Sequence, residues 1–180
     1  ETDKLNGTIS LKGGRLDDLS LIGYKVELKD GAENVTLLRP VGQEGAYYAA
    51  YGWATVSGVN PADVPTIETV WTVRGNEILT SSSPVTLVWN NGKGLTFSRV
   101  ISVDDDYLFT IVQGVQNNTN KAVELKPYGI VRRTGEPKDL KNFFILHEGL
   151  VRMSDETLDE HSYDKMHDYE FNEGDGTNKE

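Results

Sequence analysis

Alternation of apolar and polar residues with a period of two is the feature that most constrains this chain. It recurs along most of the sequence, in short runs bounded by Gly, Asn, Asp or Pro. A period of two is typical of β-strands with one buried and one exposed face, and the bounding residues favour turns. The runs are residues 7–11, 24–28, 35–38, 51–56, 69–73, 85–89, 95–103, 107–115 and 123–132.

About ten short strands with frequent turns predict an all-β fold, a large antiparallel β-sandwich. The chain of 180 residues suffices for one well-cored domain. We expect residues 1–171 to form it and residues 172–180 to be a disordered polar tail. Residues 154–171 contain no Pro or Gly and begin with a suitable N-cap, Ser154, which predicts a short, weakly helical acidic segment.

Three consecutive aspartates, Asp104 to Asp106, separate two of the apolar runs. The run before them keeps one apolar face except at Arg99, and the run after them does so except at Gln113. Aspartate side chains suit hairpin turns because they cap nearby backbone N–H groups. A calcium-binding loop would need Gly and Glu where the chain has Phe109 and Val115. The aspartates therefore predict a turn rather than a metal site.

Charge and composition exclude several function classes. The net charge is −10, and residues 155–180 contribute −8 of it, with ten acids against two lysines. The rest is nearly neutral and offers no basic face, so we expect no nucleic-acid partner. The absence of cysteine excludes disulfides, thiolate catalysis and Cys-ligated zinc. No apolar run approaches the ~18 residues that span a bilayer. The opening at Glu1, without methionine or signal peptide, indicates an excised or processed segment.

The three histidines are the first place to look for chemistry. His161 and His167 are six residues apart, which does not place two imidazoles on one helix face, so we expect no metal site. His147 precedes Glu148, and it is either half of an acid–base pair or a hydrogen-bonded residue at a strand end. Neighbouring strand residues point to opposite faces, which disfavours the pair. The sequence also lacks G-x-S-x-G. We therefore expect no catalytic residue, no cofactor and no enzymatic activity.

Aromatic residues are the other candidates for binding. Trp53, Trp71 and Trp89 could form a stacking platform for sugars or apolar segments, but a strand tryptophan in a sandwich is usually part of the core. Our candidate ligand- or partner-binding residues are Tyr48, Trp53, Trp71 and His147. A carbohydrate-binding or aldose-epimerase-like protein is the alternative function for such a sandwich.

Five stretches in order resemble one family. They are GTISLKGGRLDDLSL at 7–21, YAAYGW at 48–53, PVTLVWNNGKGLTFSRVISVDDDYLFT at 84–110, KPYGIVRR at 126–133 and ILHEGLV at 145–151. Together they resemble the large first periplasmic domain of YidC-type membrane protein insertases of Gram-negative bacteria, and the resemblance runs from about residue 5 to about residue 169.

The resemblance implies a super-β-sandwich similar to galactose mutarotase and sugar-binding folds. It implies a non-catalytic accessory domain on the periplasmic face of the inner membrane, anchored by transmembrane helices outside this chain. The partners implied are the Sec translocon, with SecD and SecF, and nascent membrane proteins; the isolated domain is expected to be a monomer. Family members continue with a further strand and an interfacial helix, so we expect this chain to be truncated at its C-terminus.

Overall fold

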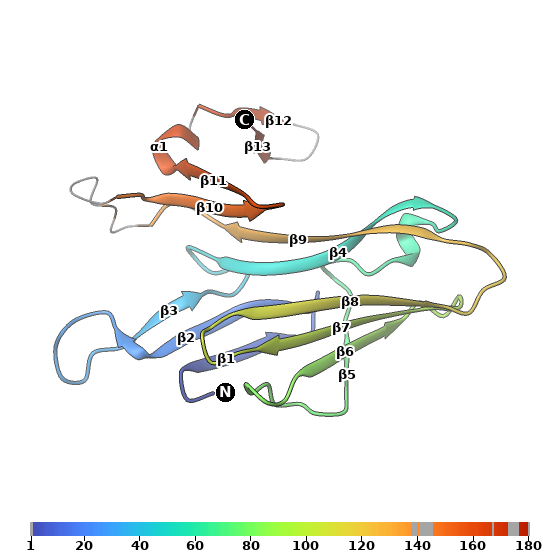
Figure 1. Cartoon of the computed structure of the whole chain (residues 1–180), viewed down its shortest axis with the longest axis horizontal. Helices are drawn as coiled ribbons and strands as arrows, with labels where there is room; N and C mark the ends of the chain where they lie inside the picture. The colour runs from blue at the N-terminus through green and yellow to red at the C-terminus, as the bar shows by residue number, and fades with distance from the viewer. Residues whose placement is uncertain (1, 138–139, 141–145, 167, 173–176, 180) are drawn as a thin grey trace. The chain divides into compact units, whose positions relative to one another are not determined.

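The computed structural model describes residues 2–137, 140, 146–166, 168–172 and 177–179. The chain divides into two compact units, Glu1–Thr134 and Gly135–Glu180, which are called unit 1 and unit 2 and are described separately. The fold is all-β, as predicted. Turns and longer loops join its strands, and the ribbon in Figure 1 shows little helix.

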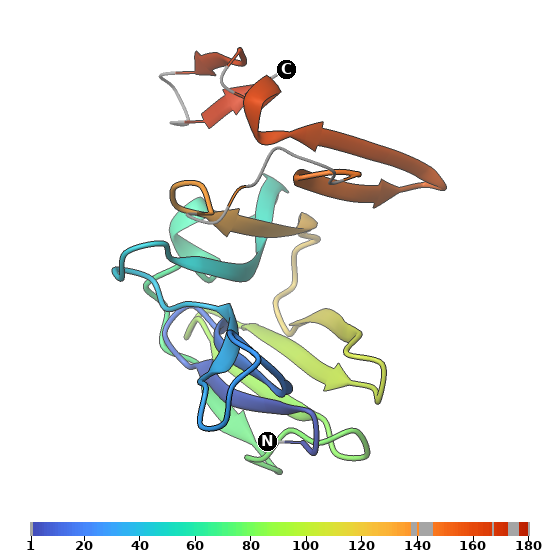
Figure 2. The same cartoon turned by 90° about the vertical axis from the view of Figure 1, so that its left-hand side faces the viewer.

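The described residues of unit 1 form two antiparallel sheets (Figures 1 and 2). The first sheet has the order β1-β2-β4-β9, with β3 also paired to β2. The second has the order β5-β6-β7-β8. The strands are β1 (Leu5–Ser10), β2 (Arg15–Lys25), β3 (Asn34–Leu38), β4 (Tyr47–Ser57), β5 (Thr72–Arg74), β6 (Val85–Asn90), β7 (Leu95–Val103), β8 (Phe109–Asn117) and β9 (Glu124–Arg133), with a 3-10 turn at Pro61–Asp63.

The core of unit 1 lies between these two sheets. Strand β7 alternates strictly between buried and half-buried residues, so its inner face is closed off from water while its outer face is not. Opposing side chains from β2 and β4 pack against it, which buries apolar surface from both layers at once. The buried cluster comprises Leu16, Ala49, Trp53, Val64, Trp71, Val85, Leu87, Leu95, Phe97 and Ile101.

The hairpin predicted around the three aspartates is confirmed. Strands β7 and β8 pair antiparallel from Leu95↔Asn117 to Val103↔Phe109, and the aspartates lie in the connection. Asp104 Oδ1 accepts hydrogen bonds from the backbone N–H groups of Asp106 (2.8 Å) and Leu108 (2.9 Å). The side chain of Asp104 therefore caps the turn, as aspartate commonly does.

The alternation predicts a strand at one place where most of the residues form none, and it fails to predict the start of strand β2. The run predicted at 24–28 extends only one residue beyond Tyr24 as strand, and Tyr24, Val26 and Leu28 are exposed because no second layer covers this tip. By contrast, β2 begins at Arg15, in a stretch where Asp17 breaks the alternation. Asp17 is nonetheless buried, since Arg15 Nε lies 3.3 Å from its Oδ2.

Unit 2 consists of two hairpins and a helical turn. Its elements are β10 (Gly149–Ser154), β11 (Thr157–Ser162), α1 (Tyr163–Met166), β12 (Glu170–Asn172) and β13 (Thr177–Lys179). The weakly helical segment expected at 154–171 contains only the one turn of α1, and Ser154 ends a strand instead of capping a helix. Asp155 and Glu156, at φ 46° and 67°, make the tight turn between β10 and β11. Of the predicted polar tail, residues 173–176 and 180 lie outside the described residues, and residues 177–179 form β13.

Candidate binding site

An apolar pocket of about 580 Å³ opens between the two sheets of unit 1. Strands β1 and β2 supply one wall, strands β6, β7 and β8 supply the other, and the segment 77–79 borders it. Strand alternation explains the lining, because every second residue of each strand faces the opposite sheet. The apolar lining includes Leu5, Ile9, Leu16, Val85, Leu87 and Val103.

Few polar groups face this pocket. Thr8 Oγ1 donates a hydrogen bond of 2.8 Å to Asp18 Oδ2, and both residues line the pocket together with Asn6 and Glu77. Pockets of about 300–1,000 Å³ with mostly apolar walls and a few polar groups are typical of ligand sites. The pocket is therefore suited to hold an apolar group whose polar end lies at the rim.

A second hollow, of about 710 Å³, adjoins the pocket and shares Thr2, Leu5 and Ile78 with it. We call its acidic lining, Asp3, Asp104 and Asp105, the acidic vestibule. Lys4 is the basic residue of this lining, and its Nζ donates to the backbone oxygen of Asp105 and lies 5.2 Å from the ring centroid of Tyr107. Lys4 thus fixes the start of the chain against the β7–β8 turn.

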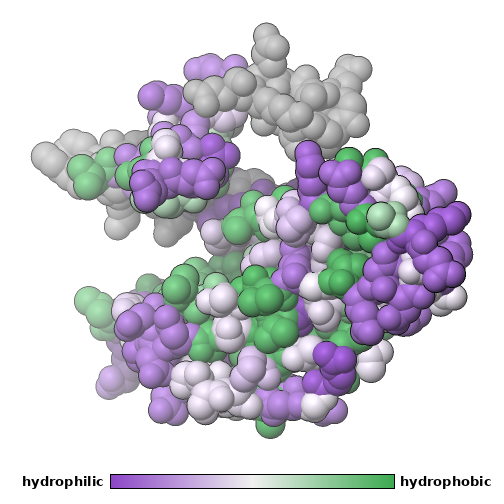
Figure 3. Space-filling view, turned by 45° about the vertical axis from the view of Figure 1, so that its right-hand side comes forward, coloured by the Kyte–Doolittle hydropathy of each residue, from purple (hydrophilic) through white to green (hydrophobic). Residues whose placement is uncertain are grey.

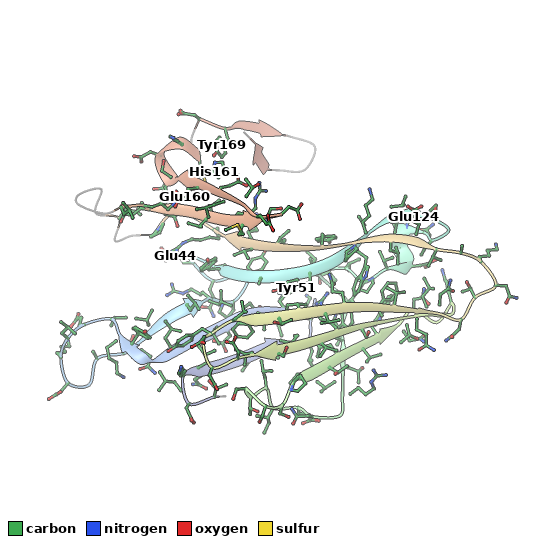
Figure 4. All side chains as sticks on the ribbon, viewed as in Figure 1. Glu44, Tyr51, Glu124, Glu160, His161 and Tyr169 are labelled. Atoms are coloured by element: carbon green, nitrogen blue, oxygen red, sulfur yellow. The ribbon has the colours of Figure 1, made fainter. Side chains whose placement is uncertain are left out.

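A buried arginine links the two sheets elsewhere in unit 1. Arg99 on β7 is 0% exposed. Its Nη1 donates to the carbonyl oxygens of Gly13 (3.2 Å) and Gly14 (2.6 Å), and its Nη2 donates to that of Tyr51 (2.7 Å). Because Gly13 and Gly14 precede β2 and Tyr51 lies on β4, one guanidinium ties β7 to the opposite sheet at two points. Figure 4 places Tyr51 between β4 and β8.

Aromatic rings complete the environment of this guanidinium. Its Cζ lies 4.8 Å from the Trp71 ring, 5.4 Å from the Tyr51 ring and 5.7 Å from the Trp53 ring. These cation–π contacts and carbonyl bonds offset the cost of burying a charge. Two polar atoms, Arg99 Nε and Trp71 Nε1, are buried without a hydrogen-bond partner in the described structure.

Burial also shifts the ionisation of this group. Desolvation lowers the pKa of Arg99 to about 10, while the nearby tyrosines Tyr51 and Tyr128 act in the opposite direction. Burial raises the pKa of Tyr51, and the positive charge of Arg99 partly opposes that rise. At neutral pH the arginine is therefore charged and the tyrosine neutral.

The predicted binding residues of unit 1 do not gather at one open site. Trp53 and Trp71 do come together, with ring centroids 6.2 Å apart, but they are 6% and 1% exposed and belong to the core. Their indole faces pack against Arg99 and the core, so they leave no open stacking surface for a sugar. Tyr48 is half-buried on β4, opposite Arg132 of β9, and His147 belongs to unit 2.

In unit 2 the two described histidines, His147 and His161, make local contacts, and His167 lies outside the described residues. His147 Nε2 lies 3.3 Å from the carbonyl oxygen of Leu150, as in the hydrogen-bonded interpretation of this residue. His161 Nδ1 is hydrogen-bonded to the hydroxyl of Tyr169, and the two rings meet edge to face with centroids 5.9 Å apart (Figure 4). Within the described part of the chain, no three His, Cys, Asp or Glu side chains are grouped as metal ligands would be.

Sequence reasoning missed the pocket lining. Ile9 belongs to a predicted strand and Leu5 precedes it, but an apolar residue that borders a cavity has the same sequence pattern as one that fills a core. Arg99 did carry a signal, since it is a charged residue on an otherwise apolar face. The sequence pattern showed that a charged residue lies on this apolar face, but it did not predict the carbonyl groups and aromatic rings that surround it.

The fold and the pocket together define an all-β sandwich with a ligand-sized apolar cavity. The chain belongs to the family described as the YidC periplasmic domain, which matches residues 1–180. This confirms the resemblance seen in the sequence.

Several relatives are called membrane protein insertase YidC. One from Ruegeria sp. (strain TM1040) is 52% identical over 173 residues, which is 96% of this chain and 28% of the relative. One from Roseobacter denitrificans is 50% identical over 97% of this chain and 29% of the relative. One from Dinoroseobacter shibae is 49% identical over 100% of this chain and 30% of the relative. The chain therefore spans less than a third of the length of these relatives.

No solved structure matches the chain. Among the described residues, no helix has the length and apolar character needed to cross a membrane.

Proposed function

We propose that this chain is a non-catalytic accessory domain of a bacterial inner-membrane protein insertase, located on the periplasmic face of that membrane. It assists insertion or folding by contacting segments of nascent membrane proteins or components of the Sec translocon, such as SecD and SecF. The support for the general class is the family match and the shared description of the relatives as membrane protein insertases.

The observation that carries a binding role is the inter-sheet pocket of about 580 Å³. Leu11 and Ile78 in its lining are apolar and exposed, at 39% and 62%, so an apolar ligand gains most by displacing water from this space. Segments of membrane proteins before insertion have that character. The pocket therefore favours substrate contact over the binding of a polar sugar.

Burial of the tryptophans supports the same choice. A sugar-binding or epimerase-like protein would use exposed aromatic faces, and here Trp53 and Trp71 surround a structural arginine instead. Arg99 is held by backbone carbonyls within the core, which suits a role in stability.

Site-specific photocrosslinking in native membranes, with the full-length insertase, tests the proposal. A photoreactive residue replaces Ile78, which is 62% exposed at the pocket, or Val112, which is exposed on β8 and does not line it. We expect adducts with newly made membrane proteins from position 78 and only background from position 112. Adducts with SecD or SecF, identified by mass spectrometry, test the translocon contact. Labelling of lipid alone, or equal labelling from both positions, contradicts the substrate-binding role.

A further inference from the structure

The pocket and the hollow beside it differ in chemistry, and their combination selects a class of ligand. The pocket walls are apolar, whereas the adjoining vestibule presents Asp3, Asp104 and Asp105. Thr2, Leu5 and Ile78 line both, so the acidic residues lie next to the apolar space.

We propose that this site receives an extended peptide segment of a membrane protein in which apolar side chains are followed by a lysine or arginine. The apolar side chains occupy the pocket between the sheets, and the basic residue lies in the acidic vestibule. This inference rests on the proposed function and names the substrate feature that the site selects.

The charge balance around the opening is the reason for placing a basic residue in the peptide. The two hollows are lined by five acidic residues, Asp3, Asp18, Glu77, Asp104 and Asp105, and by one basic residue, Lys4. Lys4 is already engaged with the Asp105 carbonyl and the Tyr107 ring. The opening therefore has an excess of negative charge, which attracts a cation and repels an anion.

The same charge disfavours a lipid as the occupant. A phospholipid or a fatty acid carries a phosphate or a carboxylate next to its acyl chains, and that group would lie among the acidic residues. A peptide can carry a positive charge without a neighbouring anion. Its backbone amides can also bond with the polar groups of Asn6 and Thr8, which line the pocket beside its apolar walls.

Binding of two matched peptides, followed by NMR chemical shifts of the 180-residue chain, tests the proposal. Both peptides are acetylated and amidated; one has the sequence Leu-Val-Leu-Ala-Arg-Gly, and the other has glutamate in place of arginine. We expect the arginine peptide to bind about ten-fold more tightly than the glutamate peptide because of charge complementarity. The largest shifts are expected at the amides of Gly7 and Ile78, which line the pocket.

Two double variants with the same loss of charge locate the selectivity. The test variant is Asp3→Asn with Asp105→Asn, and both residues are exposed in the vestibule. The control is Asp30→Asn with Glu33→Gln, which are exposed on the β2–β3 connection and line neither hollow. The test variant should reduce the preference for arginine to about two-fold, and the control should keep it. A third variant, Ile78→Asn, should weaken both peptides alike.

Each other result overturns the proposal. Equal binding of the two peptides, or a preference that the test variant leaves unchanged, removes the role of the acidic vestibule. Absence of shifts at the pocket amides with either peptide removes the peptide as the occupant. Shifts caused there by phosphatidylethanolamine and phosphatidylglycerol vesicles, in place of the peptides, assign the pocket to lipid. If the peptides show no charge selectivity or cause no shifts at the pocket, but crosslinks from position 78 to membrane proteins persist, this inference fails and the proposed function stands. If those crosslinks are also lost, the proposed function fails as well.

Discussion

Arg99 on β7 and Gln113 on β8 lie directly opposite each other in the antiparallel register, with Arg99 Nη2 3.4 Å from Gln113 Oε1. Each residue is the one polar interruption of its strand's apolar face, so the two interruptions are a single cross-strand pair. Gln113 Nε2 also donates to the carbonyl oxygen of Tyr128 on β9, at 3.2 Å. The pair therefore connects the second sheet to both β4 and β9 of the first.

Replacing Arg99 with methionine should destabilise unit 1. The substitution fills much of the space but leaves the carbonyls of Gly14 and Tyr51 buried without their donor. We expect the free energy of unfolding to fall by about 3 kcal/mol, measured by urea denaturation. Arg132→Met, at an exposed position of β9, is the matched control and should change it by less than about 0.5 kcal/mol. Equal stability of Arg99→Met and the unmodified chain would show that the desolvation of the buried guanidinium destabilises the fold by as much as its hydrogen bonds stabilise it.

Gly14→Ala should reveal how closely the chain approaches Arg99. Gly14 has φ +59°, and a Cβ there would lie 2.5 Å from Arg99 Nη1 and 3.2 Å from the Trp71 ring. Gly31 has φ +78° with nothing within 4 Å of its Cβ position, so Gly31→Ala carries only the backbone strain. We expect a loss of about 1 kcal/mol for Gly31→Ala and about 3 kcal/mol for Gly14→Ala, from thermal and urea unfolding. Similar losses at both positions would mean that the guanidinium moves aside freely.

Tyr51 should make stability decline at alkaline pH. Burial raises its pKa above 10.0 in the folded chain, so the unfolded chain releases this proton first as the pH rises. The stabilisation is complete below the unfolded pKa of 10.0 and is lost as the pH rises from there through the folded value. Tyr51→Phe lacks this proton, so its stability relative to the unmodified chain should increase between pH 8 and pH 10.5. A difference that is constant over this range would contradict the raised pKa.

The alternation of residues 95–103 and 107–115 was sufficient to predict the β7–β8 hairpin, because each run has one fully buried or half-buried face over its whole length. It failed at residues 24–28, where Val26 and Leu28 alternate without any layer to bury them. Periodicity reports a pattern of side chains and not the presence of a partner sheet. Strand β2 shows the opposite failure, because a real strand was not predicted where a charged residue is buried. The carboxylate of Asp17 is buried beside Arg15, with which it forms an ion pair.

The candidate site was less predictable than the fold. Trp53 and Trp71 were candidates because aromatic rings bind ligands, yet the same property suits them to surround the guanidinium of Arg99. The pocket depends on how far two sheets separate, which is set by three-dimensional packing rather than by the type of residue at Leu5 or Val85. The family match added what the pattern alone could not, namely the class of protein in which this sandwich occurs.

Asp104 and Asp105 are neighbours, but their substitution should change the free energy of unfolding by very different amounts. Asp104 Oδ1 accepts two backbone N–H groups in the turn, whereas the Asp105 side chain is exposed in the vestibule. We expect Asp104→Ala to lower the free energy of unfolding by about 1–2 kcal/mol and Asp105→Ala to leave it within about 0.5 kcal/mol. Asp104→Asn should retain much of the stability, since its amide oxygen can accept the same bonds. Equal effects at the two positions would mean that charge rather than capping stabilises the turn.

Glu156→Gly should stabilise the β10–β11 hairpin of unit 2. Asp155 and Glu156 both have positive φ, 46° and 67°, in a two-residue turn where Asp-Gly is strongly preferred. Glycine removes the strain at the second position, so the local opening free energy should rise by about 0.5–1 kcal/mol. Hydrogen exchange of the amides of Leu150 and His161, which face each other in a hydrogen-bonded pair of the hairpin, measures it. Glu160→Gly, in the middle of β11, is the control and should reduce protection, because a glycine there adds backbone freedom without relieving strain. Reduced protection in both variants would show that the side chain of Glu156 stabilises the hairpin by more than the strain of its positive φ destabilises it.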